Sequence, residues 1–304
     1  MISKDIEMKA TKSGNRTVTV HAEYFTSMGE AVRMVKSRPS KVENPHDQFF
    51  QNYAWPSNPK WSGFTSPAEL DELCSNGLTD ISAVQDVLKY AGQAMVQEKD
   101  KLVKKCMDVA GGAVDVPLFL SGSPECMMGL KRKKVKSRIV KATVNCEVLC
   151  DISSWEYIQA GRVISRAVAS LEKAGYRVRL VANCGLWNCG SEAALMSVVI
   201  KRENEPCNYR RLLYPLMSPS FFRGLGFNWA CTLPEYKTGW GLGQRLDMAF
   251  NDNVKEEAFD QLTRKVCGEG FVRFSINDII RLNNKNPIET SEKFLRAQLL
   301  DLEA

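Results

Sequence analysis

An acidic residue followed by closely spaced hydroxyls is the strongest candidate for chemistry in the sequence. Asp151, Ser153 and Ser154 follow an apolar run in the stretch NCEVLCDISSWEYI, residues 145–158. Carboxylate and hydroxyl oxygens are ligands that Mg²⁺ accepts, with water at its other positions. The same residues can instead cap a helix, because Glu156 stands three positions after Ser153, the spacing of a capping box. We favour the cap, since it accounts for every polar residue, and keep a Mg²⁺ site at Asp151 and Ser153 as the alternative.

Histidine and cysteine chemistry has little support. The chain holds only two histidines, His21 and His46, so a Ser-His-Asp or Cys-His arrangement would have to recruit one of them. Its ten cysteines are scattered and include no C-x-x-C pair, which argues against a zinc site and against a disulfide framework. We interpret them as free thiols, with Cys146 and Cys150 acting as small apolar residues in a strand.

The net charge of +6 is unevenly distributed. The run KRKKVKSR contributes six cations, which are Lys131, Arg132, Lys133, Lys134, Lys136 and Arg138. Such a run can contact a phosphate backbone, and Arg210, Arg211 and Arg223 could extend a basic face. The alternative is a solvated loop that leads into a strand, which we favour for an isolated run.

A long glycine-rich and aromatic segment, residues 225–245, is a second candidate for binding. Trp229, Tyr236 and Trp240 could form the lip of a partner-binding site, or they could pack the segment locally on the sheet. The stretch GWGLGQ within it fits neither common glycine-rich nucleotide motif. A nucleotide site is therefore not expected.

These residues need a scaffold, and the hydrophobic periodicity predicts an α/β fold. Residues 139–150 read as a buried strand, residues 154–174 as an amphipathic helix and residues 176–184 as a second strand, which makes a parallel β-α-β unit. The next loop is too short for a crossover, so the strand at 194–203 should return antiparallel. Further elements are expected as helices at 209–222, 253–267 and 289–302 and a strand at 271–278.

The chain divides, on this interpretation, into two parts. Residues 1–138 form an α-rich accessory region with extended loops, a strand near 16–25, and helices that begin at Ser66 and near Thr79, the second running to about Met107. Residues 139–304 form the α/β domain. Its sheet is expected to be Rossmann-like, mostly parallel and with one antiparallel strand.

The element order from residue 139 onward and the Asp-Ile-Ser-Ser stretch resemble the von Willebrand factor A domain. In that family the first strand ends in Asp-x-Ser-x-Ser, whose side chains help to hold a Mg²⁺ ion that binds a partner's carboxylate. Asp151 and Ser153 match the first two positions, while Trp155 stands at the third and offers no oxygen. Thr232 and Asp278 are candidates for the remaining ligands. The resemblance implies a Rossmann-like fold and a Mg²⁺ site to which Trp155 supplies no ligand.

Three short segments also resemble uncharacterised proteins of tailed bacteriophages: Trp-Ser-Gly-Phe, Gly-Ser-Pro-Glu-Cys-Met and Asp-Ile-Ser-Ser-Trp. This resemblance implies a phage origin. The polar N-terminus and the lack of a long apolar run lead us to expect a cytoplasmic protein with no membrane segment.

The leading hypothesis is a non-enzymatic binding or assembly protein with a protein partner. It would bind through Asp151, Ser153 and Trp155 at the strand end, together with the 225–245 segment. The first alternative is a nucleic-acid-binding protein that uses residues 131–138. The second is a hydrolase with an unusual acidic site, which needs another carboxylate beside Asp151.

Overall fold

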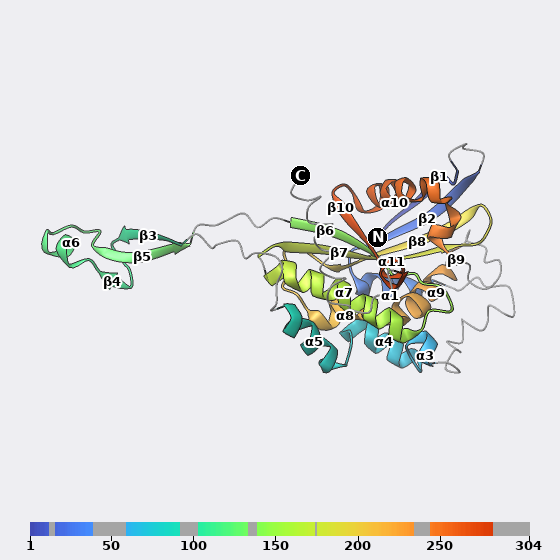
Figure 1. The fold of residues 1–304 in the computed structure, drawn as a ribbon, viewed down its shortest axis with the longest axis horizontal. Coiled ribbons are helices and arrows are strands. Elements are labelled where there is room, and N and C mark those ends of the chain that lie inside the picture. Colours follow the sequence, from blue (N-terminus) through green and yellow to red (C-terminus); the bar gives the residue numbers. More distant parts are fainter. Residues whose placement is uncertain are drawn as a thin grey trace.

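A mixed sheet of seven strands organises the protein (Figure 1). The computed structural model describes residues 1–11, 16–38, 59–91, 103–132, 139–173, 175–233 and 244–281. The strand order is β1-β2-β8-β7-β6-β10, and β9 pairs with β7 off this path. The strands are β1 (Ile2–Lys9), β2 (Thr17–Phe25), β6 (Ile139–Asn145), β7 (Arg177–Trp187), β8 (Glu192–Lys201), β9 (Gln244–Arg245) and β10 (Phe271–Ser275).

The expected α/β class and its central unit are confirmed. β6 and β7 are parallel and are joined by the helix α7 (Ser154–Lys173), and β8 returns antiparallel to β7. β10 adds to the other side of β6 in parallel. β6 is buried at most of its positions, as expected for a strand covered on both faces.

Helices cover the two faces of this sheet unequally (Figure 1). One face carries α7 with the helices α1 (Met28–Ser37), α3 (Pro59–Ser62), α4 (Pro67–Asn76), α5 (Ile81–Ala91), α8 (Tyr209–Met217), α9 (Phe227–Ala230) and α11 (Ile276–Arg281), and with a π-helix, η1 (Phe221–Gly226). The other face carries α10 (Asp252–Cys267), which contacts β1, β2 and β10. A short 3₁₀ helix, η2 (Leu246–Ala249), follows β9. The larger hydrophobic core therefore lies on the α7 face.

The helices α7 and α8 pack closely at a single glycine. A Cβ atom placed on Gly161 of α7 would overlap the carbonyl oxygen of Leu216 in α8. Near this crossing the hydroxyl of Tyr157 donates a hydrogen bond of 2.8 Å to the carbonyl oxygen of Pro215. The chain thus uses the smallest residue to bring two helix backbones together.

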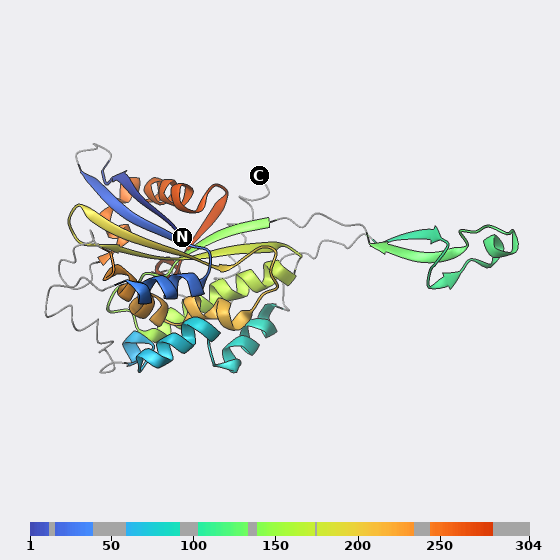
Figure 2. The ribbon, with the colours of Figure 1, turned by 180° about the vertical axis from the view of Figure 1, so that it is seen from behind.

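The N-terminal residues take part in the same sheet. β2 pairs in parallel with β8, and β1 pairs antiparallel with β2. The helices α1, α3, α4 and α5 then pack against the α7 face, as Figures 1 and 2 show from opposite sides. The first 91 residues therefore contribute both strands and helices around the unit formed by β6, α7 and β7.

Residues 103–132, which we call the arm, form a second sheet. Its order is β3-β5-β4, made of β3 (Val103–Asp108), β4 (Ala113–Val114) and β5 (Met127–Arg132), with the short helix α6 (Val116–Leu120). In both ribbon views it stands apart from the seven-stranded sheet. The expectation of a helix up to Met107 is wrong from Val103 onward, because β3 pairs with β5 there. The helix expected at 289–302 lies outside the described residues.

No helix in the described part of the chain is long and apolar enough to cross a membrane.

Candidate functional site

The first strand of the central unit ends earlier than its apolar pattern suggests. β6 stops at Asn145, where its pairing with both β10 and β7 ends. Beyond that point β9 takes the place beside β7, with Arg245 opposite Leu186. Residues 146–153 therefore leave the sheet as a loop, and the expectation that Asp151 ends the strand is wrong.

Ser153 caps α7. Its hydroxyl accepts a hydrogen bond of 3.3 Å from the Glu156 amide and donates one of 2.6 Å to the Glu156 carboxylate. The same carboxylate accepts a bond of 2.9 Å from the Ser153 amide, so the capping box is complete. These bonds from Ser153 lower the pKa of Glu156. The cap that we favoured from the sequence is therefore present.

The other members of the proposed strand-end surface lie beside this cap. Asp151 is exposed, and the side chain of Trp155 is 68% exposed in the first turn of α7. Thr232 and Asp278 were the candidates for the remaining metal ligands. The hydroxyl of Thr232 is buried and donates a hydrogen bond of 2.7 Å to the Trp229 carbonyl, and Asp278 lies on α11. Among the described residues no three His, Cys, Asp or Glu side chains are grouped to hold a metal ion.

A buried arginine holds the 146–153 loop against the helices. Arg223, only 3% exposed, donates to the carbonyl oxygens of Leu149 at 2.9 Å, Ile152 at 2.8 Å and Trp61 at 2.7 Å. Its guanidinium also lies 4.3 Å from the centroid of the Trp61 ring. Burial lowers the pKa of Arg223 to about 10. Arg223 is thus no part of an exposed basic face, whereas Arg210 and Arg211 are exposed.

Trp229 is also an internal residue. Its side chain is 0% exposed, and its indole nitrogen donates 2.7 Å to the carboxylate of Glu23 in β2. Arg38 holds the same carboxylate at 2.8 and 2.9 Å. The idea that Trp229 forms a binding lip is wrong because the residue packs in the core; Tyr236 and Trp240 lie outside the described residues.

The basic run is only partly visible. Lys131 and Arg132 are the last two residues of β5 in the arm. Lys133, Lys134, Lys136 and Arg138 lie outside the described residues.

The geometry reveals a polar site that the sequence did not, which we call the strand-end pocket. It lies beyond the carboxyl ends of β6 and β10, and its walls include Asn145, Glu147, Arg245, Asp247, Arg273 and Asn277. Its cavity volume is about 20 Å³, roughly the space of one water molecule. The sequence signal was a single acid, Glu147, inside the apolar run after Asn145.

The charges in this pocket are unevenly matched. Arg245 pairs with Asp247, its Nε donating 2.8 Å to Oδ1, and Lys255 reaches the other oxygen of the same carboxylate at 2.6 Å. Burial alone would raise the pKa of Asp247, but the bonds from Arg245 and Lys255 lower it. Arg273 pairs with Glu256 at the side of the pocket. The single carboxylate of Asp247 therefore forms ion pairs with two cations, Arg245 and Lys255.

Glu147 has a different environment in the same pocket. Its side chain is 3% exposed, and this burial raises its pKa to about 8, helped by the nearby charge of Asp247. Its Oε2 atom has no hydrogen-bond partner among the described residues, and the same holds for Arg245 Nη1 and Asn277 Nδ2. At neutral pH most Glu147 side chains carry a proton and can donate a hydrogen bond.

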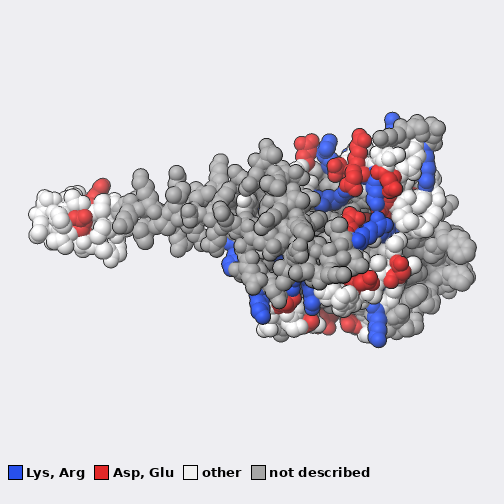
Figure 3. All heavy atoms as spheres, in the orientation of Figure 1, with Lys and Arg blue, Asp and Glu red and all other residues white. Residues whose placement is uncertain are grey.

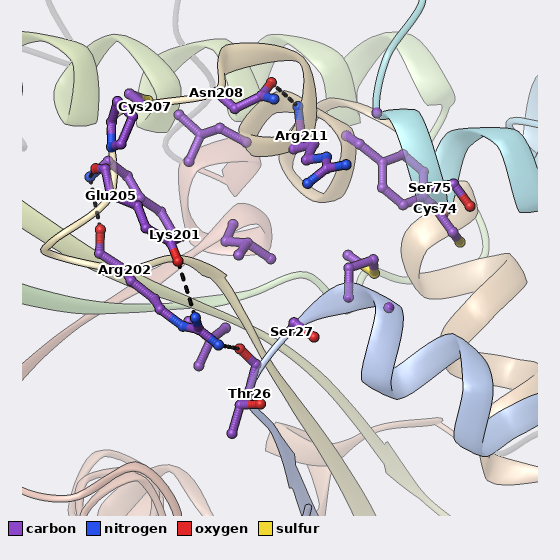
Figure 4. A pocket seen from close by; sticks show the side chains of 18 of the residues that line it. Thr26, Ser27, Cys74, Ser75, Lys201, Arg202, Glu205, Cys207, Asn208 and Arg211 are labelled. Carbon is purple, nitrogen blue, oxygen red and sulfur yellow. Dashed lines mark hydrogen bonds and ion pairs between the residues drawn. The ribbon is translucent and has the colours of Figure 1, made fainter.

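A larger cavity of about 480 Å³ lies at the end of β8, between the first turns of α1 and α8 (Figure 4). Several of its polar side chains already have partners. Arg202 bonds to Glu205 at 3.1 Å and to the Thr26 carbonyl at 3.0 Å, and Lys201 pairs with Glu172 at 2.8 Å. This cavity therefore presents fewer unmet groups than the strand-end pocket.

Comparison with known proteins places the chain in a family. A family model described as "Domain of unknown function (DUF7192)" matches residues 9–272, which include the arm and most of the seven-stranded sheet. No curated protein and no solved structure matches the chain. Because the matched region covers most of the 304 residues, the chain belongs to the DUF7192 family.

Proposed function

We propose that this protein is a non-enzymatic assembly protein that associates through its arm with the arm of a second copy. The observation that carries the proposal is the apolar surface of the arm. Six of the eleven large apolar side chains that are exposed among the described residues belong to it. They are Val109, Val114, Val116, Phe119, Leu120 and Met128.

The arm lacks a core of its own. None of its side chains that the structure describes is buried, and Phe119 and Leu120 on α6 are 61% and 78% exposed. A sheet this small needs a covered apolar face to be stable, and exposed apolar patches commonly mark protein interfaces. A protein partner would supply this cover.

A second copy of the same chain is the simplest partner for the apolar surface of the arm. Each copy carries the same apolar surface, so two arms can cover each other about a twofold axis, the commonest symmetry of oligomers. Figure 3 shows the described side chains of the arm as mostly uncharged, with a few acidic groups. Charge repulsion between two such surfaces is small, and apolar burial dominates.

Two resemblances are consistent with this proposal. The strand order β8-β7-β6-β10, with β8 antiparallel, supports a von Willebrand factor A-like core, a family that binds partner proteins. The likeness to tailed-phage proteins suits an assembly role, and we propose a phage origin on that basis. The exposed Trp155, beside Asp151, is a second surface that a protein partner could contact.

Sedimentation velocity over a range of concentrations tests the proposal. We expect a concentration-dependent dimer that Phe119→Asp together with Leu120→Asp weakens by at least about 100-fold, since burying each such side chain stabilises by roughly 1.5–3 kcal/mol. Ile139→Asp together with Met248→Asp is the matched control, because it places the same two charges on exposed apolar positions outside the arm. A wild-type monomer at every concentration, or a dimer lost only in this control variant, contradicts the proposal.

A further inference from the structure

The basic run at residues 131–138 is not isolated in the structure. Its first two residues, Lys131 and Arg132, end β5 and pair with β3, in which Lys104 stands directly opposite Lys131. Arg132 and Lys105 belong to the rungs on either side of this pair. Four cations from two separate segments of the sequence therefore meet at one end of the ladder, and we call them the arm base.

The ladder places no acidic residue beside the arm base. Among the six residue pairs of β3 with β5, the only acid is Asp108, which lies at the opposite end of β3, roughly 14 Å along the strand from Lys104. Like charges that stand directly opposite each other in antiparallel strands are destabilising. The pair of Lys104 and Lys131 is therefore stabilised by any partner that brings negative charge to it.

The net positive charge of the chain is concentrated in the two segments that supply the arm base. Residues 98–105 and 131–138 together contain ten cations and two acids, whereas the rest of the chain contains 31 cations and 33 acids. The cations of these segments other than the arm base lie outside the described residues. A polyanion is therefore attracted to this end of the arm and not to the protein as a whole.

The arm base has the shape of a two-stranded ribbon. β4 pairs only with the first two residues of β5, so the ladder consists of β3 and β5 alone from there to the arm base. Opposite residues share a face and successive residues alternate, which places Lys104 and Lys131 on one face of the ribbon. Lys105 and Arg132 lie on the other face. The arm stands apart from the seven-stranded sheet, with α6 at its far end (Figures 1 and 2).

We propose that the arm base binds double-stranded DNA in its major groove. That groove is about 12 Å wide and admits a two-stranded β-ribbon, whereas the major groove of an RNA duplex is too deep and narrow to be read. A ribbon in a groove has a phosphate backbone on each side, so it uses cations on both of its faces. An anionic membrane would contact one face only. The apolar side chains of α6 lie at the other end of the arm, so the same arm can also join a second copy.

Fluorescence anisotropy of a labelled DNA duplex, titrated with the full chain at several salt concentrations, tests this proposal. Binding by the wild type should weaken steeply with salt, because the cations displace counterions from the phosphates. Neutralising the arm base should reduce the slope of log Kd against log salt by about 3–4 and weaken binding at low salt by at least about 10-fold. This variant replaces the four cations by glutamine: Lys104→Gln, Lys105→Gln, Lys131→Gln and Arg132→Gln.

Two further variants make the result specific to charge at the arm base. Lys104→Arg together with Lys131→Arg keeps both charges and should bind as the wild type does. The matched control neutralises four exposed cations outside the arm, and its slope should equal that of the wild type. It carries Lys9→Gln, Lys60→Gln, Arg264→Gln and Lys265→Gln.

Three results would overturn the proposal. They are no binding of the DNA duplex by the wild type, an equal loss of binding in the matched control, and binding of an RNA duplex of the same sequence that is as tight or tighter. The variant with Phe119→Asp and Leu120→Asp retains the arm base and should still bind DNA. The DNA site and the proposed dimer can therefore fail separately.

Discussion

Glu147 makes the stability of the protein depend on pH. Its pKa is about 8 in the folded chain, against an ordinary value of 4.5, because burial disfavours the charged form. The folded state therefore holds this proton more tightly than the unfolded state does. The resulting stability is complete below about pH 4.5 and is lost as the pH rises to about 8, by roughly 4–5 kcal/mol in total.

Urea unfolding of the wild type and of Glu147→Gln between about pH 5 and pH 8 measures this contribution. The free energy of unfolding of the wild type should fall with pH relative to that of the variant, because glutamine does not titrate. All other groups are shared, so the difference isolates Glu147. Parallel curves for the two proteins would show that the buried carboxyl has no raised pKa.

Substitutions at Ser153 and Asp151 test whether this stretch acts as a helix cap. Ser153→Ala removes the cap of α7 and should lower the free energy of unfolding by about 1 kcal/mol. Asp151→Ala changes an exposed residue two positions away and should cost less than about 0.5 kcal/mol. Urea unfolding of both variants is sufficient, and a larger loss for Asp151 would contradict the assignment of the cap.

The sequence was informative about single residues where a local rule applied. The spacing of Ser153 and Glu156 predicted the capping box because both partners lie within one turn. It did not reveal the strand-end pocket, because Glu147, Arg245 and Asn277 come from distant segments that only the sheet brings together. The buried role of Trp229 was likewise hidden, since its partner Glu23 lies in β2.

At the scale of elements, the contact between α7 and α8 depends on Gly161. Gly161→Ala should destabilise the protein by about 1–3 kcal/mol, because the added methyl group meets the Leu216 carbonyl and the helices must separate. Gly29→Ala is the matched control: it lies in α1 with open space around its Cβ position, and should be neutral or stabilising by up to about 1 kcal/mol. Thermal unfolding compares the two, and equal melting temperatures would contradict this view of the packing.

Elements with a strong local pattern were predictable, and those defined by distant pairing were not. The start of α4 at Pro67, after the cap Ser66, follows from local signals, as does the periodicity of α7. The end of β6 at Asn145 depends on β9 and β10, which the local pattern cannot show. The strand β3 was read as helix because only its pairing with β5 defines it.

At the scale of the whole molecule, the seven-stranded sheet joins parts of the chain that are far apart in sequence. β1 and β2 extend the sheet next to β8, so the N-terminal residues contribute to it directly. Composition and periodicity placed strands in both halves of the chain but contained no signal for this pairing. The arm was equally hidden, since its three strands carry no regular alternation and no core.

The pairing of β2 with β8 also sets an order of events during synthesis. Val20 and Ala22 lie opposite Ala193 and Leu195 in this pair. β2 therefore cannot pair with β8 until the ribosome has passed the middle of the chain. Until then its apolar side chains and its unpaired backbone are open to other nascent chains. The late arrival of β8 therefore leaves one edge of β2 unpaired through much of synthesis, and an unpaired strand edge favours aggregation.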